Sequence, residues 1–238
     1  MPAEFFFTER AAMLAALQNA LCTHLQHSLA GAARTTLFLS GGESPGPLYR
    51  ALAFAALPWE RISVALVDER WVPPAHEASN ERLVRDTLLR EQAVACEFTG
   101  MKVEGELHGA DEAAAVAACN RAYKALPRPW SAALLGMGPD GHTASLFPRA
   151  QRLHEILQAK STCAAVHAPA GGCAGAWRNR MTMTPHALLQ CEHLYLLITG
   201  RDKRVLYEKA LVIADQAEMP ISIFLQQSAV PLSVYWSP

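Results

Sequence analysis

The amino-acid sequence predicts an α/β protein with a doubly wound, mostly parallel sheet that carries helices on both faces. Short apolar runs alternate with amphipathic segments along the chain, and polar, Gly-containing loops follow several of the runs. A chain of 238 residues with 51% hydrophobic and 18% charged side chains can also bury one large core. Since no internal repeat, long linker or low-complexity block interrupts the chain, residues 1–238 are predicted to form a single domain.

The first part of the chain predicts a helix, a strand and a Gly-rich loop. Residues 10–30 place leucines at helical spacing, namely Leu14, Leu17, Leu21 and Leu25. Residues 35–39 are typical of a buried strand, and residues 40–47 form a loop that runs into a helix. In that helix we expect Ser44 as the N-cap and Pro45 at the first position. A Gly-rich loop before a helix N-terminus is a phosphate-binding arrangement.

A strand, a charged loop and a helix follow. The strand at 62–67 ends in the charged segment 68–74, after which Ser79 or Asn80 caps a helix. A later Ala-rich helix opens at Asp111. Its apolar face consists of Val116, Cys119, Tyr123 and Leu126.

The second half of the chain continues the alternation. Strands are predicted at 131–135, 163–167, 194–199, 221–225 and 232–236. Residues 180–183 alternate between polar and apolar side chains, and Thr184 then caps a helix with Pro185 at its first position. Gly200 separates a strand from a helix at 201–213. Because helices connect successive strands, the sheet is expected to be mostly parallel.

Composition excludes several classes of partner. A formal net charge of −1 gives no general attraction to nucleic acid or to an anionic membrane, so any bound anion must be held by a local cluster of cations. No apolar run approaches the length of a membrane span, and the first residues lack the basic region of a signal peptide. We therefore expect a soluble, cytoplasmic protein.

Cysteine and histidine usage indicates neither disulfides nor a metal site. The six cysteines lack a C-x-x-C pair and stand mostly in apolar or Ala-rich context, so we expect buried free thiols. The nine histidines show no spacing typical of metal ligands. No metal and no cofactor are expected.

The loop 136–148 contains the best candidate for a catalytic base. Asp140 and His142 are its only titratable groups, and a separation of two residues in a tight loop lets the carboxylate orient the imidazole or a shared water. The alternative is a turn with a solvated Asp and His. The position of the loop after a buried strand favours a functional role.

The same loop fits the dinucleotide-binding fingerprint, through Gly136, Gly138 and Gly141. However, Asp140 would place a carboxylate against the pyrophosphate, and Pro148 leaves little room for the helix that the fingerprint requires. We therefore do not expect a nicotinamide cofactor.

Residues 42–46 fit the Gly-x-Ser-x-Gly nucleophile elbow of α/β-hydrolases. The residue after the serine must donate its backbone N–H to the oxyanion hole, and here it is Pro45, which has none. The sequence thus favours Ser44 as a helix cap over Ser44 as a nucleophile.

The helix after Gly200 begins with three cations, Arg201, Lys203 and Arg204, although helix N-termini favour negative charge by about 0.3–1 kcal/mol per residue. A bound anion would resolve this conflict, and the alternative is that the side chains point into water. Several segments are predicted to meet at the carboxyl edge of the sheet, namely 40–47, 68–74, 136–148 and 200–204 with Arg178 and Arg180. Such a site suits a small phosphorylated molecule that is attacked by water.

Five segments resemble, in order, the motifs of 6-phosphogluconolactonases. They are Leu-Ser-Gly-Gly-Glu-Ser-Pro at 39–45, Asp-Glu-Arg-Trp-Val-Pro at 68–73 with Ser79 and Asn80 behind it, Gly-Met-Gly-Pro-Asp-Gly-His-Thr-Ala-Ser-Leu-Phe-Pro at 136–148, Arg-Met-Thr-Met at 180–183, and Thr-Gly-Arg-Asp-Lys at 199–203. The similarity spans roughly residues 36–236. It implies a modified Rossmann fold and hydrolysis of 6-phosphoglucono-δ-lactone to 6-phosphogluconate, the second step of the oxidative pentose phosphate pathway, without metal or cofactor.

The resemblance also implies roles for individual residues. His142 takes the place of the water-activating base, and Asp140 orients the ring or the water. The implied substrate- and phosphate-binding residues are Ser40, Gly41, Gly42, Asp68, Arg70, Gly138, Arg180 and Lys203. Arg70 or loop N–H groups would meet the charge that develops on the carbonyl oxygen. Which cation holds the phosphate is left open, and Glu43 replaces the Ser or Thr usual in the family, so a phosphate contact from that side chain is not expected.

Two other functions remain open at this stage. Glucosamine-6-phosphate deaminases share the Gly-rich loop, an Asp-Glu pair and a Gly-x-Asp-Gly-His block, but Arg70, Trp71 and segment 143–148 favour the lactonase. A non-catalytic sugar-phosphate sensor would normally carry a DNA-binding segment, and only about thirty residues precede the first strand. The expected partner is a sugar-phosphate lactone, and we expect a monomer, with a dimer left open.

Overall fold

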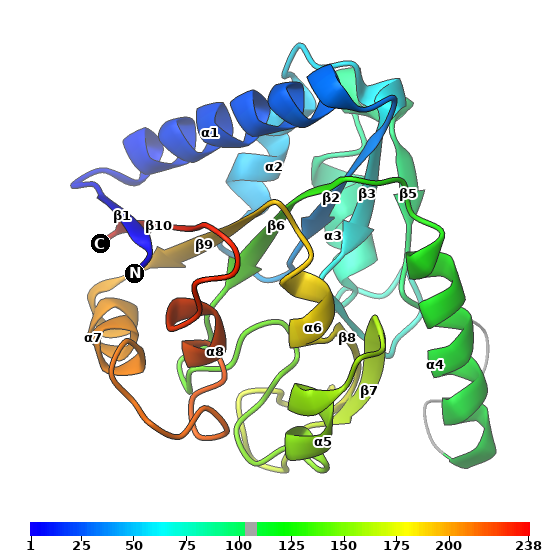
Figure 1. Cartoon of the computed structure of the whole chain (residues 1–238), viewed down its shortest axis with the longest axis vertical. Coiled ribbons are helices and arrows are strands. Elements are labelled where there is room, and N and C mark those ends of the chain that lie inside the picture. The colour runs from blue at the N-terminus through cyan, green and yellow to red at the C-terminus, as the bar shows by residue number, and fades with distance from the viewer. Residues whose placement is uncertain (103–108) are drawn as a thin grey trace.

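A seven-stranded sheet runs through the computed structural model, which describes residues 1–102 and 109–238 (Figure 1). The strands lie in the order β1-β10-β9-β6-β2-β3-β5, and every neighbouring pair is parallel. They are β1 (Ala3–Phe6), β2 (Thr35–Leu39), β3 (Ile62–Leu66), β5 (Glu97–Thr99), β6 (Trp130–Gly136), β9 (His193–Thr199) and β10 (Leu232–Ser237). The predicted fold class is confirmed.

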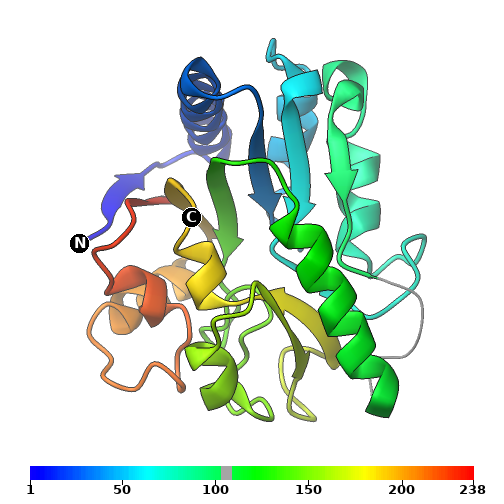
Figure 2. The ribbon, with the colours of Figure 1, turned by 45° about the vertical axis from the view of Figure 1, so that its right-hand side comes forward.

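Helices cover both faces of this sheet. They are α1 (Arg10–Gly31), α2 (Gly46–Ala53), α3 (Asn80–Thr87), α4 (Gly109–Lys124), α5 (Leu153–Gln158), α6 (Pro185–Leu188), α7 (Arg201–Ala210) and α8 (Ser222–Leu225), with short 3-10 helices η1 (Trp59–Arg61) and η2 (Glu91–Ala95). Leu134 pairs with Tyr195, whose hydroxyl points to a carbonyl oxygen of α1, 3.4 Å away. Ala133, on the other face, pairs with Phe38, which stacks on Tyr123 of α4. In Figure 2, α4 lies on the near side of the strands.

The long helix α1 packs an apolar stripe against the sheet. Met13, Leu17, Leu21 and Leu25 are all 0% exposed, whereas Leu14 is only partly buried. The predicted helix is confirmed, with its buried stripe beginning one residue earlier than expected. Complete burial of each leucine stabilises the fold by about 1.5–3 kcal/mol relative to an exposed side chain.

Two of the three predicted helix caps are confirmed, and one is wrong. The Ser79 hydroxyl accepts the backbone N–H of Arg82 at the start of α3, and the Thr184 hydroxyl accepts that of Ala187 at the start of α6. Ser44 does not cap α2, because that helix starts at Gly46 and no side chain caps it. The prediction failed because Pro45 extends the loop by one residue before the helix begins.

A second, three-stranded antiparallel sheet was not predicted as such. It consists of β4 (Asp68–Arg70), β8 (Asn179–Met183) and β7 (Cys163–His167), in that order. The charged segment 68–74, predicted as a loop, therefore opens with a strand. The pairing places Arg70 directly opposite Arg180.

The structure also corrects one predicted strand, adds two strands that were not predicted, and shortens one helix. Residues 221–225 form helix α8 and the turn before it, because a short apolar run does not distinguish a strand from a buried helix. Strands β1 and β5 were missed, because they have only four and three residues and no fully buried positions. Helix α7 ends at Ala210, earlier than expected.

Among the described residues, none of the helices combines the length and the apolar character that crossing a membrane requires. All six cysteines lie in the described part of the chain and are free thiols. Cys173 is exposed, contrary to the expectation of buried thiols.

Candidate active site

The carboxyl ends of four neighbouring strands, β9, β6, β2 and β3, border one pocket. The pocket has an empty volume of about 850 Å³, part of it open solvent. The predicted site residues that line it are Ser40, Gly41, Gly42, Asp68, Arg70, Gly138, His142, Arg180 and Lys203. Asp140 does not line the pocket itself but is hydrogen-bonded to His142. Segments far apart in the sequence thus meet at one edge of the sheet, where ligands of open α/β sheets bind.

Asp140 and His142 form a close pair at the centre of the loop after β6. Asp140 Oδ1 lies 2.5 Å from His142 Nδ1 and also accepts the backbone N–H of His142 at 3.1 Å. A Cβ atom at Gly138 would overlap the imidazole, so only glycine lets the ring lie this close to the backbone. Because Asp140 engages Nδ1, Nε2 is the nitrogen that a neutral ring can use as a base.

The charge of Asp140 is stabilised by its neighbour. Burial raises the pKa of the Asp140 carboxyl, but the hydrogen bonds and charge of His142 lower it by more, so the net shift of the pKa is downward. Asp140 is therefore ionised at neutral pH and favours the tautomer with a proton on His142 Nδ1. The side chains are 29% and 20% exposed, so water reaches the pair.

Cys173 joins this pair in a group of three possible metal ligands. The donor atoms of Asp140, His142 and Cys173 all lie within 4.8 Å of one another. Two ligands of a tetrahedral zinc ion stand roughly 3.3 Å apart, whereas Asp140 and His142 are held at 2.5 Å by their hydrogen bond. Burial and the Asp140 charge raise the pKa of the Cys173 thiol, which disfavours the thiolate that a metal binds. The folded arrangement favours a hydrogen-bonded pair beside a thiol over a preformed metal site.

Arg180 brings a buried positive charge to the pocket. Its side chain is 5% exposed, Nε donates to the Trp177 carbonyl oxygen at 2.5 Å, and the guanidinium lies 5.4 Å from the centre of the Phe147 ring. Burial lowers the pKa of Arg180 to about 10, although attraction to Asp68 opposes the shift, and the group remains a cation at neutral pH. With Arg70 opposite it in the small sheet, the pocket favours an anion.

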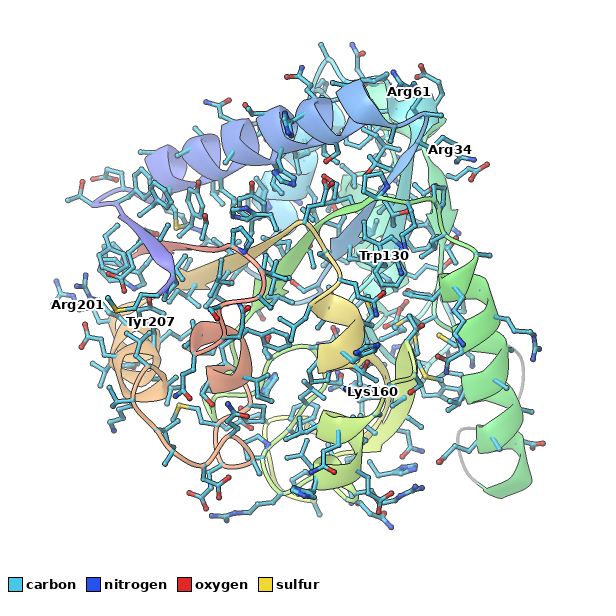
Figure 3. The ribbon with its side chains drawn as sticks, viewed as in Figure 1. Arg34, Arg61, Trp130, Lys160, Arg201 and Tyr207 are labelled. Atoms are coloured by element: carbon cyan, nitrogen blue, oxygen red, sulfur yellow. The ribbon has the colours of Figure 1, made fainter. Side chains whose placement is uncertain are left out.

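Lys203 is the cation of α7 that lines the pocket. Burial lowers the pKa of its ammonium, and the Glu43 carboxylate nearby opposes that shift. Arg204 instead lies over the rings of Phe6 and Trp236, and Arg201 is exposed at the periphery (Figure 3). The three cations therefore divide, because successive helical residues point about 100° apart. Lys203 lines the pocket, as a bound anion requires, and Arg201 is exposed to water, as the alternative has it.

Arg178 also lies apart from the residues that line the pocket. Its Nε donates to the Ala168 carbonyl oxygen at 2.8 Å, within the same loop region. Arg178 lies outside the strand, one residue before β8 begins at Asn179, whereas Arg180 is the second residue of β8.

Two polar residues that shape the site were not predicted as site residues. Asn80 was expected as a helix cap and as part of a lactonase-like motif, yet it lines the pocket and its Oδ1 accepts from Arg70 at 2.7 Å. Ser145 donates its hydroxyl to Asp68 Oδ2 at 2.5 Å. Both residues lie in segments that resemble the lactonase motifs, so membership of those segments was the available signal.

Glu69 belongs to the scaffold below these residues. Its carboxylate accepts the backbone N–H groups of Arg70, Asn80 and Glu81 and the hydroxyl of Ser79. Burial raises the pKa of Glu69, while these hydrogen bonds lower it in part. A carboxylate at this place satisfies the free N–H groups that begin α3.

The geometry supports neither of the two discounted motifs. After Gly141 the chain forms turns, and the next helix is α5, which starts only at Leu153. The Ser44 hydroxyl lies 3.4 Å from that of Thr199 and is followed by Pro45, which cannot donate to an oxyanion.

An open parallel sheet with a histidine–aspartate pair and several cations at its carboxyl edge defines an α/β protein with a pocket suited to a small anion. Residues 8–236 match the family described as glucosamine-6-phosphate isomerases/6-phosphogluconolactonase, and the chain belongs to this family.

Relatives within the family indicate which of its enzymes this chain resembles. The 6-phosphogluconolactonase of Rhizobium meliloti (strain 1021) is 37% identical over 232 residues, which are 98% of this chain and 97% of the relative. That of Pseudomonas aeruginosa (strain PAO1) is 37% identical over 217 residues, 90% of this chain and 86% of the relative. The predicted resemblance to 6-phosphogluconolactonases, and with it the enzyme class, is confirmed.

Solved structures show the same similarity. A 6-phosphogluconolactonase from Shewanella baltica OS155 has a TM-score of 0.92 and 32% identity, covering 100% of this chain and 98% of that one. A monomeric glucosamine-6-phosphate deaminase has a TM-score of 0.78 over 99% of this chain and 97% of that one. Its identity is 16%, so that likeness concerns the fold alone.

Proposed function

We propose that this protein hydrolyses 6-phospho-D-glucono-1,5-lactone to 6-phospho-D-gluconate in the oxidative pentose phosphate pathway. The observation that carries the proposal is the Asp140–His142 pair in a pocket that Arg70, Arg180 and Lys203 also line. A base beside several cations suits an ester with a phosphate on the same small molecule. The 6-phosphogluconolactonase relatives, similar over nearly the full chain, support the same substrate.

In the proposed mechanism, Nε2 of neutral His142 takes a proton from water as the water oxygen attacks the lactone C1 carbonyl. The carbonyl oxygen becomes negative and is stabilised by Arg70 or by N–H groups of the surrounding loops. When the tetrahedral intermediate collapses, the bond from C1 to the ring oxygen breaks and the proton on His142 passes to that oxygen. Asp140 keeps the ring oriented throughout and stabilises the imidazolium that forms.

The phosphate would be held by Lys203 and Arg180, with the N–H groups of the loop at Ser40, Gly41 and Gly42. Gly42 has a φ of 96°, a conformation that side chains disfavour and that turns the loop sharply before α2. Asp68 and Gly138 complete the proposed binding surface, Asp68 toward substrate hydroxyls and Gly138 as the floor under His142. The proposed enzyme needs no metal or cofactor.

A release assay tests the proposal against its alternatives. The purified protein, given freshly prepared 6-phosphogluconolactone, should form 6-phosphogluconate faster than the spontaneous reaction, which must be subtracted. Formation of ammonia from glucosamine 6-phosphate instead would support the deaminase alternative. Binding of sugar phosphates without turnover of either substrate would support the sensor. We further propose that the chain acts as one domain and a monomer in the cytoplasm, with a dimer left open.

A further inference from the structure

Asn80 is a buried side chain at the pocket wall with hydrogen bonds on both sides of its amide. It is 1% exposed, lies at the first position of α3 and lines the pocket. Its Oδ1 accepts from Arg70 at 2.7 Å, and its Nδ2 donates to the Asp68 backbone oxygen at 2.7 Å. Asn80 therefore joins both ends of β4 through one amide group.

The contacts define which way the amide must point. The acceptor side faces a guanidinium, which can only donate, and the donor side faces a carbonyl oxygen, which can only accept. Asp68 Oδ1 lies 3.4 Å from Nδ2 on the same side. An aspartate here would lose the donor and place a second carboxylate beside Asp68, so the site requires an amide.

Among the described residues, the Arg70 side chain is held through one terminal nitrogen. This nitrogen, Nη1, donates to Asn80 and to the Ala78 carbonyl oxygen at 3.0 Å. Its Nε is buried and has no hydrogen-bond partner among the described residues. The other terminal nitrogen, Nη2, bonds to no described residue and is the donor left for a ligand oxygen in the pocket.

The Gly-rich loop rests on the same amide. A Cβ atom at Gly41 would overlap the Asn80 side chain, so the loop backbone lies directly against it. Asn80 thus fixes the guanidinium of Arg70 and supports the loop proposed to bind phosphate.

We infer that Asn80 is a positioning residue that holds the Arg70 guanidinium at the pocket wall, where it meets the substrate oxygen. This inference rests on the proposed function, since it assigns Arg70 a ligand. Arginine has several rotatable bonds, and fixing one end of its guanidinium before substrate binds avoids that ordering cost during catalysis.

The test is a double-mutant cycle on kcat/KM with Asn80→Ala and Arg70→Met. Asn80→Ala alone should lower kcat/KM by about 10–100-fold, as expected for a misplaced charged donor. In the Arg70→Met background the same change should lower it less than about twofold, because the group that it positions is gone. Effects that multiply in the double variant would overturn the inference.

Ser79→Ala is the matched control for damage to the start of α3. Ser79 is buried, caps the same helix and bonds to Glu69, but it does not line the pocket. It should lower Tm at least as much as Asn80→Ala does and leave kcat/KM within about twofold of wild type. Equal kinetic losses in both variants would show that Asn80 acts only through the fold.

Two further experiments apply if Asn80→Ala does not fold or if the wild type is inactive. If Asn80→Ala does not fold, Asn80→Ser enters the same cycle, because it also removes the acceptor for Arg70. If wild type does not hydrolyse the lactone, the proposed function fails separately, and the cycle is measured on the affinity for 6-phosphogluconate, whose carboxylate offers an oxygen to Arg70. Non-additive losses of affinity would then support the positioning role, and additive losses, or an Arg70→Met variant that binds 6-phosphogluconate normally, would contradict it.

Discussion

Two histidine–carboxylate pairs lie in separate pockets of the described structure. Asp140 and His142 stand at the carboxyl edge of the large sheet, and Glu112 and His167 stand in a groove between α4 and β7. The oxygen to nitrogen distances are 2.5 Å and 2.7 Å, and all four side chains are between 20% and 29% exposed. Neither the distance nor the burial distinguishes a candidate base from a structural pair.

The two pairs differ in the second ring nitrogen and in the charges around it. His167 Nδ1 lies 3.0 Å from Asn179 Oδ1, so both of its nitrogens are engaged, whereas no described residue bonds to Nε2 of His142. In the groove, Arg152 is paired with Glu155. In the pocket, Arg70, Arg180 and Lys203 line the same cavity as His142. A base needs a free nitrogen, and an anionic substrate needs cations that are not already neutralised.

The largest expected effect separates the two histidines. His142→Asn should lower kcat on the lactone by about 10²–10⁴, the range for loss of a general base, with the fold retained. His167→Asn, the matched variant in the groove, should leave kcat within about twofold of wild type. Initial rates at saturating substrate, corrected for spontaneous hydrolysis, and a circular dichroism spectrum of each variant are the measurements. Near-normal turnover in His142→Asn, or an equal loss in both variants, would remove the distinction.

The next effect concerns Lys203 and Arg180, two cations that line the pocket. A charge-assisted hydrogen bond is worth about 1.5–3 kcal/mol, so Lys203→Met and Arg180→Met should each raise KM for the phosphorylated lactone by roughly 10–100-fold. Arg152→Met removes a cation that is already paired in the groove and should leave KM unchanged. Steady-state kinetics on the three variants provide the comparison.

Unphosphorylated glucono-δ-lactone serves as the control for these cations. Wild type should strongly prefer the phosphorylated substrate, and Lys203→Met and Arg180→Met should lose most of that preference while activity on the plain lactone changes little. Variants that keep full discrimination would show that the phosphate binds elsewhere.

Sequence reasoning identified the pocket better than it identified the polar framework behind it. The strands with continuous apolar runs were predictable, because burial on both faces leaves an unambiguous pattern, and loops at their carboxyl ends must share one edge. Asp140 and His142 are two residues apart, so their contact is local and could be read from the chain. Asn80 and Ser145 act through contacts with residues of β4, which no local pattern encodes.

The errors have a similar origin. Arg201, Lys203 and Arg204 looked equivalent in sequence, and only the orientation of α7 selects Lys203 for the pocket. Residues 221–225 gave the same apolar signal as a strand, and the surrounding structure decides between the two: the N–H of Ile221 donates to the Gly141 carbonyl oxygen. That contact supports the loop of His142, so a misassigned element turns out to brace the site.

A third histidine, His193, extends the comparison to the free energy of unfolding. No carboxylate among the described residues pairs with His193, which stacks on Tyr195 and bonds to the Ser233 hydroxyl. Its pKa is lowered to about 4, first by burial and then by His24. Its folded pKa lies below the value of about 6.5 in the unfolded chain. The unfolded state therefore binds more protons between those values, and the free energy of unfolding should fall as pH drops from about 6.5 to 4.

His193→Gln removes this titration and should flatten that part of the profile. The contribution is on the order of 1–2 kcal/mol, after allowance for solvent screening of a half-buried ring. Urea unfolding of wild type and variant at pH 7, 5.5 and 4.5 measures it, and the difference between the two proteins cancels carboxylates that titrate in the same range. An identical slope in both proteins would contradict the assignment. His24, whose pKa burial also lowers, should account for part of the slope that remains.

The smallest expected effect is none, and it tests whether water attacks directly. Ser44→Ala should retain most activity, with no burst phase and no covalent adduct, because Pro45 leaves Ser44 without an oxyanion hole. Cys173→Ala and prolonged chelation should also change turnover by less than about twofold, because the pair of Asp140 and His142 is held closer than two ligands of one zinc ion would be. A burst of product or a mass increase on Ser44 would show that Ser44, and not water, attacks the lactone. Activity that chelation abolishes and zinc restores would show that a metal takes part. Either result would overturn direct attack by water that His142 activates.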